Sequence, residues 1–343
     1  MLKWILGVLV GLVTVGFAAL FALYLWFNHW FNSPSSLTLA QAPVLVEIPR
    51  GSHSRSVSRL LLAQGIVSKH LFINETTLYW SARLFGGAGN LQAGVYQVKP
   101  EDSLQSLWQR MNNGEQHFFS ITFAEGLNFS EWRALVAEHP RLRQEWADLT
   151  PEQIIEQLAS DTNYSLPEGL LFPDTYRFYA GTTDRQIYQQ AFRRMEAVLL
   201  ELWQQRADDI PLDSPYEALV LASIVEKETG AAHERGKVAS VFVNRLNSGM
   251  RLQSDPTIVY GLGERYRGVI YRSDIQETTP YNTYRINGLP PTPIAMPGKD
   301  AIAATLNPEH TDYYYFVSRN DGTHIFSRTL AEHNRAVQTY QRN

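Results

Sequence analysis

The chain of 343 residues contains no cysteine. Disulfide bonds, catalysis by a thiolate and zinc sites with cysteine ligands are therefore excluded. Histidine offers no recognisable metal motif either, because His310, His324 and His333 are widely spaced and no His-Glu-x-x-His sequence occurs. We expect no metal site and no cofactor.

Runs of basic residues are also absent, and the formal net charge is -4. Both features argue against sequence-independent binding of nucleic acid, so we expect no nucleic-acid partner. The chain has no Gly-x-Ser-x-Gly, P-loop or Gly-x-Gly-x-x-Gly motif, and the glycine-rich stretch at 86–89 is typical of a flexible turn. With 44% hydrophobic and 19% charged residues, the body should be globular, and its length allows two domains.

A long apolar run lies close to the N-terminus. Residues Trp4 to Phe27 are uncharged, and at about 1.5 Å per residue they can cross a hydrocarbon core of about 30 Å. Lys3 precedes the run, and no Lys or Arg follows until Arg50. This asymmetry predicts a transmembrane helix with a cytoplasmic N-terminus. A cleaved signal peptide is the alternative, but the run is too long and the small-residue triplet at 40–42 lies far beyond it.

The sequence pattern predicts an α+β fold in four segments. They are a cytoplasmic start with a membrane anchor (1–31), a polar linker (32–43), a small α/β subdomain (44–124) and a mixed α+β catalytic domain (125–343). In the subdomain we expect strands at 44–48, 93–98 and 118–123 and helices at 54–64, 70–85 and 103–111. The pattern leaves open whether this subdomain binds glycan or serves as a spacer.

The larger domain should be mainly helical in its first half. Helices are predicted at 129–139, 151–160, 183–206, 215–229 and 234–246, with a loop at 167–176. The last third is richer in Pro, Gly and Tyr. It predicts a strand at 313–317, a hairpin-like turn at 320–322 and a closing helix from about residue 330.

The helix between Ser214 and Gly230 carries two carboxylates. Ser214 is a typical N-cap, Gly230 is a typical stop, and nearly every residue between them is apolar, as in a buried helix. Glu226 and Glu228 stand in the last turn. Glu228 stacks over larger apolar side chains than Glu226 does, so its charged form should be the less favoured of the two.

This difference makes Glu228 the candidate general acid and Glu226 a supporting carboxylate. The alternative is that both are solvated residues of a helix end, beside Lys227. The helix macrodipole is unfavourable for carboxylates at a C-terminus, so two of them at the end of a buried helix favour a functional role.

The segments that follow are dense in side chains suited to an uncharged, hydroxyl-rich ligand. Aromatic rings offer platforms, and amides, hydroxyls and carboxylates offer hydrogen bonds. The candidates are Gln253, Asp255, Thr257, Tyr260, Tyr281, Asn282 and Tyr284. Ordinary loop chemistry is the alternative for each of them.

Six segments together resemble the MltG family, the YceG-like endolytic murein transglycosylases. They are PEGLLFPDTYRF (167–178), LASIVEKETG (221–230), ERGKVASVFVNRLNSGMRLQSDPTIVYG (234–261), TPYNTY (279–284), GLPPTPIAMPG (288–298) and YYYFVSRNDGTHIFSRTLAEHN (313–334). The resemblance is specific over about 168–335 and weak in the N-terminal block, where family members carry a LysM-like subdomain.

The resemblance implies a single-pass inner-membrane enzyme with a periplasmic catalytic body. It would cut nascent peptidoglycan strands internally between N-acetylmuramic acid and N-acetylglucosamine, leave a 1,6-anhydro end and so end strand elongation. The family's catalytic glutamate falls on Glu228, the second Glu of the EKET motif. The implied partners are glycan strands, the inner membrane and peptidoglycan synthases.

One carboxyl group suffices for such a reaction. Glu228 would protonate the leaving oxygen and then deprotonate the muramoyl 6-hydroxyl. The rival enzyme is a two-carboxylate muramidase with Asp255, Asp174 or Glu226 as the partner of Glu228. A non-catalytic glycan-binding scaffold of the cell-wall machinery is a third interpretation.

Overall fold

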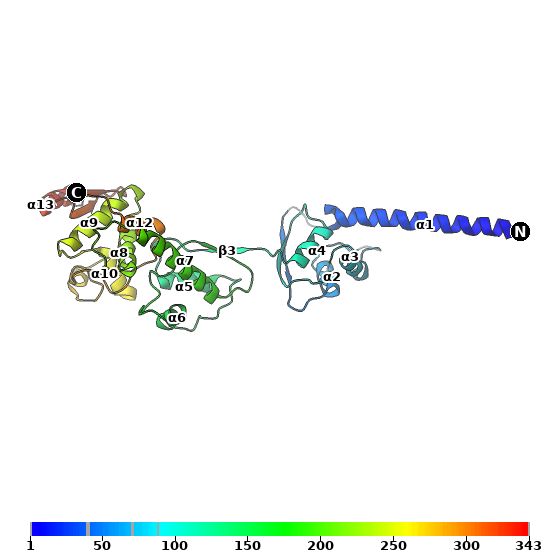
Figure 1. The fold of residues 1–343 in the computed structure, drawn as a ribbon, viewed down its shortest axis with the longest axis horizontal. Coiled ribbons are helices and arrows are strands. Elements are labelled where there is room, and N and C mark those ends of the chain that lie inside the picture. Colours follow the sequence, from blue (N-terminus) through cyan, green and yellow to red (C-terminus); the bar gives the residue numbers. More distant parts are fainter. Residues whose placement is uncertain (1, 39–41, 70–71, 88, 342–343) are drawn as a thin grey trace. The chain divides into compact units, whose positions relative to one another are not determined.

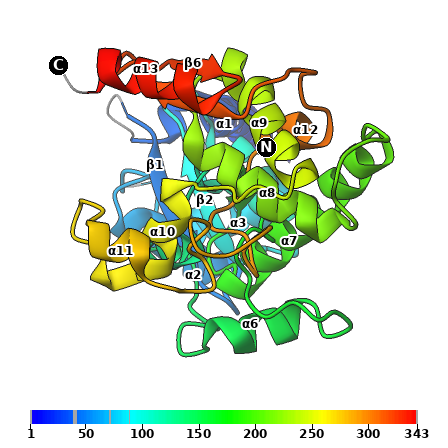
Figure 2. The same ribbon diagram turned by 90° about the vertical axis from the view of Figure 1, so that its left-hand side faces the viewer.

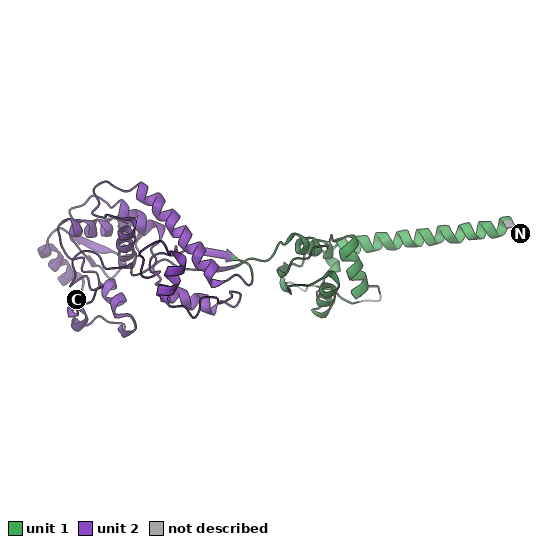
Figure 3. Ribbon diagram, turned by 60° about the horizontal axis from the view of Figure 1, so that its bottom comes forward, with its two compact units in different colours: residues 1–119, 178–180 green, residues 120–177, 181–343 purple. Residues whose placement is uncertain are grey.

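The computed structural model describes residues 2–38, 42–69, 72–87 and 89–341 (Figure 1). Residues 39–41, 70–71 and 88, which fall in the expected linker, helix and turn, lie outside the described residues. The chain forms two compact units, coloured separately in Figure 3. Unit 1 contains Met1–Phe119 and Phe178–Ala180, and unit 2 contains Ser120–Arg177 and Gly181–Asn343.

Unit 1 combines a long N-terminal helix with a small mixed body. Its elements are α1 (Leu2–Asn32), η1 (Pro34–Ser36), β1 (Val44–Ile48), α2 (Ser54–Ala63), α3 (Glu75–Leu84), β2 (Gly94–Val98) and α4 (Leu104–Asn113). β1 and β2 pair antiparallel, from Val44 opposite Val98 to Ile48 opposite Gly94. Alternate residues of these strands are buried and pack against α2, α3 and α4, which gives the α/β body.

Helix α1 carries the expected apolar run. Its most apolar stretch is not buried against the rest of the protein, and α1 is the one helix of the described chain that is long and apolar enough to cross a membrane. The last turn of α1 has a different environment. Phe31 is only 1% exposed and belongs to the core of unit 1, together with Leu37 from the expected linker.

The first residues after α1 are also fixed to unit 1. Ser36 is buried, and its Oγ accepts a hydrogen bond from Leu104 N at 2.7 Å, at the start of α4. Thr38 N donates to Ile66 O at 2.7 Å. The end of α1 and residues 36–38 therefore pack as part of the folded body rather than as a free spacer.

Unit 2 is mainly helical, with two small two-stranded sheets. Its elements are β3 (Phe119–Thr122), α5 (Phe129–Glu138), α6 (Pro151–Leu158), β4 (Thr175–Phe178), α7 (Asp184–Gln204), α8 (Pro215–Glu228), η2 (Ala232–Glu234), α9 (Arg235–Asn247), α10 (Asp255–Leu262), η3 (Gly263–Arg265), α11 (Arg272–Gln276), α12 (Lys299–Leu306), β5 (Tyr315–Ser318), β6 (His324–Ser327) and α13 (Leu330–Tyr340). Strand β3 pairs with β4 and β5 pairs with β6. Helix α13 packs on the β5–β6 hairpin, as Figure 2 also shows.

Several elements of unit 2 were not predicted from the sequence. Strand β4 occupies the end of the segment expected to be a loop, and α10, α11 and α12 lie in the region expected to be irregular. Helix α10 is short and contains Pro256, three β-branched residues and Gly261, so its intrinsic helix propensity is low. Tertiary contacts to residues 279–284 hold it instead.

Candidate active site

Helix α8 forms the centre of unit 2. The Oγ of Ser214 accepts a hydrogen bond from Glu217 N at 3.2 Å, which caps the start of the helix. Every residue from Ala218 to Val225 is buried, because α7, α9, α10 and α12 all contact α8. Such a helix holds its last residue, Glu228, in a fixed position.

The carboxyl group of Glu228 lies where α8 ends and the segment before α10 returns. Ser254 Oγ donates a hydrogen bond to Glu228 Oε1 at 2.5 Å. The residue keeps part of its surface exposed, yet burial of its carboxyl raises the pKa to about 7, and the nearby Asp255 charge adds to this rise. The Ser254 hydrogen bond and the charge of Arg245 act in the opposite direction. Glu228 therefore exists in both protonation states near neutral pH.

Arg245 of α9 fixes the chain around this carboxyl. Its guanidinium is buried; Nε donates to Tyr314 O at 2.7 Å, and Nη1 donates to Leu252 O. Burial lowers the pKa of Arg245. The side chain thus ties α9 to the segments before α10 and before β5, and it supplies a positive charge near Glu228.

Glu226 has a separate environment, although it stands only two residues earlier. Its Oε2 accepts a hydrogen bond from Gly298 N at 3.0 Å, at the start of α12. Burial raises its pKa, the Gly298 hydrogen bond opposes this rise, and the charge of Glu125 adds to it. Glu226 therefore binds the backbone of the loop before α12, whereas Glu228 bonds to the Ser254 hydroxyl.

The two residues that flank Ser254 have exposed side chains. Gln253 has a φ of 50°, an uncommon conformation for a residue other than glycine, and its N–H donates to Thr283 O at 3.1 Å. Asp255 Oδ1 accepts a hydrogen bond from Tyr284 Oη at 2.7 Å. The structure thus brings together Gln253, Asp255 and Tyr284 from the predicted set, close to Glu228.

Two members of the predicted set are engaged inside the protein. Thr257 is buried, and its Oγ1 lies 2.6 Å from Ser254 O and 2.8 Å from Thr283 Oγ1. Asn282 is 1% exposed, and its Nδ2 donates to Glu277 O at 2.6 Å and to two other carbonyls at the end of α11. These contacts give Thr257 and Asn282 a role in fixing the loop.

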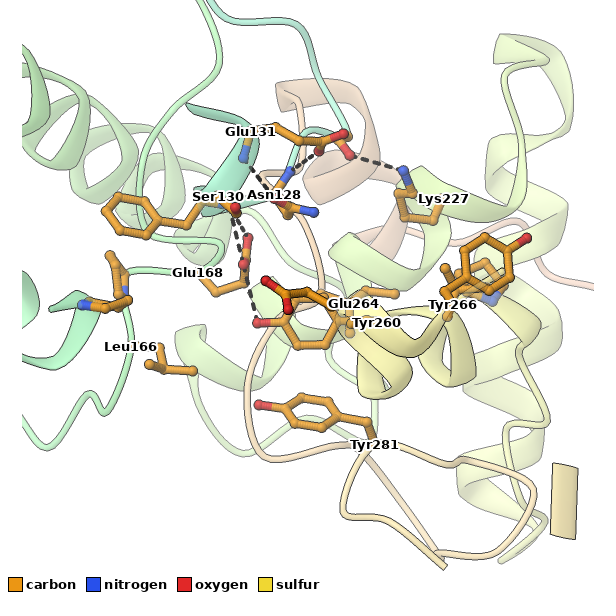
Figure 4. Close-up of a pocket in the computed structure, with 18 of the residues that line it drawn as sticks. Asn128, Ser130, Glu131, Leu166, Glu168, Lys227, Tyr260, Glu264, Tyr266 and Tyr281 are labelled. Carbon is orange, nitrogen blue, oxygen red and sulfur yellow. Dashed lines mark hydrogen bonds between the residues drawn. The ribbon is translucent and has the colours of Figure 1, made fainter. Parts of the chain in front are cut away.

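A cavity of about 1030 Å³ lies beside the start of α10 (Figure 4). Its wall includes Lys227, Asp255, Tyr260 and Tyr281. The rings of Tyr260 and Tyr281 meet edge to face at 4.9 Å. Glu228 does not line the cavity itself. The cavity is lined by Lys227, which precedes Glu228 in the sequence, and by Asp255, which follows its hydrogen-bond partner Ser254. Glu228 therefore lies at one side of this cavity.

Glu168 is a carboxyl with a raised pKa in the cavity wall itself. It is 4% exposed; both of its oxygens accept from Phe129 N, at 3.1 and 3.2 Å, and Oε2 also accepts from Tyr260 Oη at 3.2 Å. Figure 4 shows this carboxyl joined to Tyr260, with Tyr281 beside them. Burial raises the pKa of Glu168 to about 7, and its hydrogen bonds lower it.

The sequence-based list of site residues omitted Glu168, Ser254 and Arg245. A signal for Glu168 was present, since it is the one charged residue in the otherwise apolar and turn-forming stretch from 166 to 173. Asp174, a candidate partner of Glu228, is exposed next to β4 and does not line the cavity. Within the described part of the chain, no group of three or more His, Asp or Glu side chains could hold a metal ion.

The comparisons with known proteins identify the family of the chain. The sequence model of the YceG-like family matches residues 46–339, which contain Glu168, Glu226 and Glu228. The chain belongs to the YceG-like family. It is 31% identical, over 88% of its length and 86% of the relative's, to a protein of Bacillus subtilis named endolytic murein transglycosylase.

Two further proteins are similar to this chain over most of its length. A protein of Streptococcus pneumoniae with the same name is 27% identical over 86% of this chain, which spans only 58% of that longer protein. The crystal structure of a putative yceG-like protein from Listeria monocytogenes matches with a TM-score of 0.55 and 30% identity, covering 87% of this chain and all of that one. The YceG-like fold therefore extends over both units.

Proposed function

We propose that this protein is an endolytic murein transglycosylase, and that Glu228 is its catalytic residue. The observation that carries the proposal is the environment of Glu228: a carboxyl with a pKa of about 7, fixed at the end of a buried helix and beside a cavity. The similarity to relatives with that name supplies the substrate, which is the glycan strand of peptidoglycan.

In the proposed reaction Glu228 acts twice. Its protonated carboxyl donates a proton to the glycosidic oxygen as the bond from the muramoyl C1 to that oxygen breaks. The muramoyl 6-hydroxyl then attacks C1 and gives its proton to the Glu228 carboxylate, which restores the starting state. The products are a 1,6-anhydromuramoyl end and a free 4-hydroxyl on N-acetylglucosamine. A pKa of about 7 suits both steps, because neither form of the carboxyl is strongly favoured.

The cavity provides the groups that would hold the strand. Tyr260 and Tyr281 offer aromatic faces, and Asp255 offers hydrogen bonds at the edge nearest Glu228. Gln253 and Tyr284 lie outside the lining, beside Ser254 and bonded to Asp255 respectively, and would extend the site. Glu168 fixes the Tyr260 hydroxyl from inside the wall. Thr257, Asn282 and Glu226 are assigned to support, because their polar atoms bond within the protein.

A muramidase that uses two carboxyls is the second candidate, and one observation favours keeping it: Asp255 lines the cavity and contributes to the raised pKa of Glu228. The products distinguish the two reactions. A transglycosylase releases anhydro ends, whereas a hydrolase releases reducing ends.

The decisive experiment compares Glu228→Gln with the wild type on isolated glycan strands, with mass spectrometry of the released fragments. We expect the wild type to produce internal fragments with anhydro ends. The variant should lose at least 100-fold in rate, a loss typical of a missing general acid, without a change in melting temperature. Glu226→Gln is the matched control from the same helix, and it should retain cleavage. Full activity in Glu228→Gln would refute the assignment, and glycan binding without cleavage by the wild type would favour the scaffold interpretation.

The remaining assignments concern placement in the cell. We propose that α1 is a single inner-membrane span with its N-terminus in the cytoplasm and both units in the periplasm, because Lys3 precedes the span. The small body of unit 1 would be a LysM-like subdomain, serving either as a glycan-binding module or as a spacer. Peptidoglycan synthases would be the partners that deliver nascent strands to the cavity.

A further inference from the structure

The outer end of α1 lies at a definable depth in a membrane. A hydrocarbon core of about 30 Å takes about 20 residues of helix, so a span that starts after Lys3 leaves the core near Tyr24. The residues that follow are Trp26, Phe27 and Trp30, which are typical of the interface between lipid tails and headgroups. This turn of α1 is therefore expected at the outer surface of the bilayer.

The end of α3 touches α1 at this depth. Phe85, the residue that follows α3, places its ring 6.4 Å from that of Tyr24, 5.9 Å from Phe27 and 6.0 Å from Phe31. All these residues belong to unit 1, and Figure 1 shows α3 close to the end of α1. The C-terminal end of α3 therefore lies near the level of the lipid headgroups.

One face of α3 is apolar and remains uncovered. Its opposite face, with Leu78, Ser81 and Ala82, is buried. On the open face Trp80 is 50% exposed and Leu84, one turn later, is 65% exposed. Phe85 beside them is also exposed in part. This patch of three side chains is continuous with the apolar surface of α1.

The composition of the patch matches a lipid interface rather than the apolar core of a bilayer. Trp is the residue most typical of the headgroup region, where its ring meets lipid and its Nε1 meets water. Arg83 is exposed between Trp80 and Leu84 in the sequence, so its charge can reach lipid phosphates. An aromatic ring, an aliphatic side chain and a basic group together resemble the surface of an interfacial helix.

We propose that Trp80, Leu84 and Phe85 form a second membrane contact, which inserts into the interface of the same leaflet that α1 leaves. This contact would fix the orientation of unit 1 relative to the membrane, where a single helix alone would let it turn. The inference rests on the proposed role of α1 as a membrane span but not on the proposed catalytic activity.

The absence of cysteine makes the test direct, because one introduced cysteine is the one labelling site. Trp80→Cys and Leu84→Cys are made separately in the full chain, labelled with a nitroxide and reconstituted in vesicles of phosphatidylethanolamine and phosphatidylglycerol. Power-saturation EPR then compares collisions with oxygen, which concentrates in lipid, and with a water-soluble nickel chelate. The control is Glu115→Cys, an exposed site just beyond the end of α4 that is remote from its contact with Ser36.

We expect labels at 80 and 84 to favour oxygen and the label at 115 to favour the nickel chelate. If the nickel chelate reached all three labels equally, the proposal would be overturned, and a protein partner would become the better candidate to cover the patch. Preference for oxygen at all three would also overturn it, because it would indicate collapse of the whole unit onto lipid. Cleavage of glycan strands by the same labelled proteins is measured separately, so a failure of the catalytic proposal is recognised independently.

Discussion

At the scale of single residues, the surroundings of each carboxyl set its chemistry. Glu226 and Glu228 are two residues apart in α8, yet Glu226 accepts from a backbone N–H and Glu228 accepts from a serine hydroxyl. The proton affinity of Glu228 reflects a balance between burial, which favours the neutral form, and the Ser254 hydrogen bond, which favours the charged form. This balance can be changed at Ser254 without altering Glu228.

Replacement of Ser254 by Ala should shift the pH profile of cleavage. The lost hydrogen bond stabilises the carboxylate, so its removal raises the pKa of Glu228 further. Because the proposed reaction starts from the protonated form, kcat/KM falls as pH rises through this pKa, near 7 in the wild type. We expect this decline to move upward by about one to two pH units, since such hydrogen bonds contribute about 1.5–3 kcal/mol.

The pH dependence of kcat/KM for strand cleavage measures this shift. Ser240→Ala is a suitable control, because Ser240 is also buried but bonds to the Thr311 hydroxyl and not to a carboxyl. A Ser254→Ala profile that coincides with the wild-type profile would show that the hydroxyl does not tune Glu228.

Glu168 should make the stability of unit 2 depend on pH. Its pKa rises from 4.5 to about 7 on folding, so folding favours the protonated carboxyl. The stability that this preference contributes is complete below pH 4.5 and is lost as pH rises through 7, a difference of about 3 kcal/mol. Glu168→Gln keeps an oxygen that can accept from Phe129 N and Tyr260 Oη but does not titrate. The variant should therefore gain stability over the wild type between pH 5 and pH 8.

Denaturant unfolding at several pH values tests this prediction. Glu264→Gln offers a control in the same cavity, because it makes the same substitution at an exposed carboxylate. Parallel curves for Glu168→Gln and the wild type would contradict the assigned environment of Glu168.

At the scale of elements, α10 depends on its contacts with residues 279–284. The Oγ1 of Thr257 lies within hydrogen-bonding distance of Ser254 O and Thr283 Oγ1, and Thr283 Oγ1 accepts from Ser254 N at 2.9 Å. These bonds join the start of α10 to the loop that carries Tyr281 and Tyr284. They also fix the backbone of Ser254, which positions its hydroxyl at Glu228.

Replacement of Thr257 by Val should separate this loop from α10. The two side chains have a similar shape, but Val leaves the buried Ser254 O without this donor, which costs about 1–3 kcal/mol of unfolding free energy. Thr257→Ser keeps the hydroxyl and should lose less. Denaturant unfolding compares the three proteins. Equal stability of the Val variant and the wild type would show that the hydroxyl does not hold α10.

At the scale of the whole molecule, the long apolar helix α1 and the folded body of unit 1 overlap in sequence. Phe31 belongs to the last turn of α1 and also to the core of unit 1. Phe27 and Trp30 pack against the same core. The anchor therefore cannot be removed at residue 32 without loss of core side chains.

Two proteins truncated at the N-terminus test this overlap. A chain of residues 33–343 loses Phe31, and removal of a buried Phe typically costs about 3–5 kcal/mol. A chain of residues 27–343 keeps it. Calorimetry should show a lower melting transition for unit 1 in the shorter protein and an unchanged transition for unit 2. Both proteins should cleave isolated strands at similar rates, and identical unit 1 transitions would contradict the packing of Phe31.

The local features of this protein follow from its sequence alone. The apolar run gives α1, because a predominantly apolar stretch of that length is stable as a helix in lipid. The cap at Ser214 and the apolar residues after it give α8, and helical stacking ranks Glu228 above Glu226. These features depend on neighbours within one or two turns, so no tertiary information is needed to predict them.

The features that depend on distant parts of the chain required the tertiary structure. Glu168 meets Phe129 and Tyr260, which lie 39 and 92 residues away, and Ser254 meets Glu228 across 26 residues. Asn282 and Thr257 have side chains suited to a ligand, yet the fold directs them into the protein. Residue type shows which hydrogen bonds a side chain can form, whereas packing determines which partner it reaches and how much water it keeps. The cavity beside Glu228 is therefore a property of the folded chain.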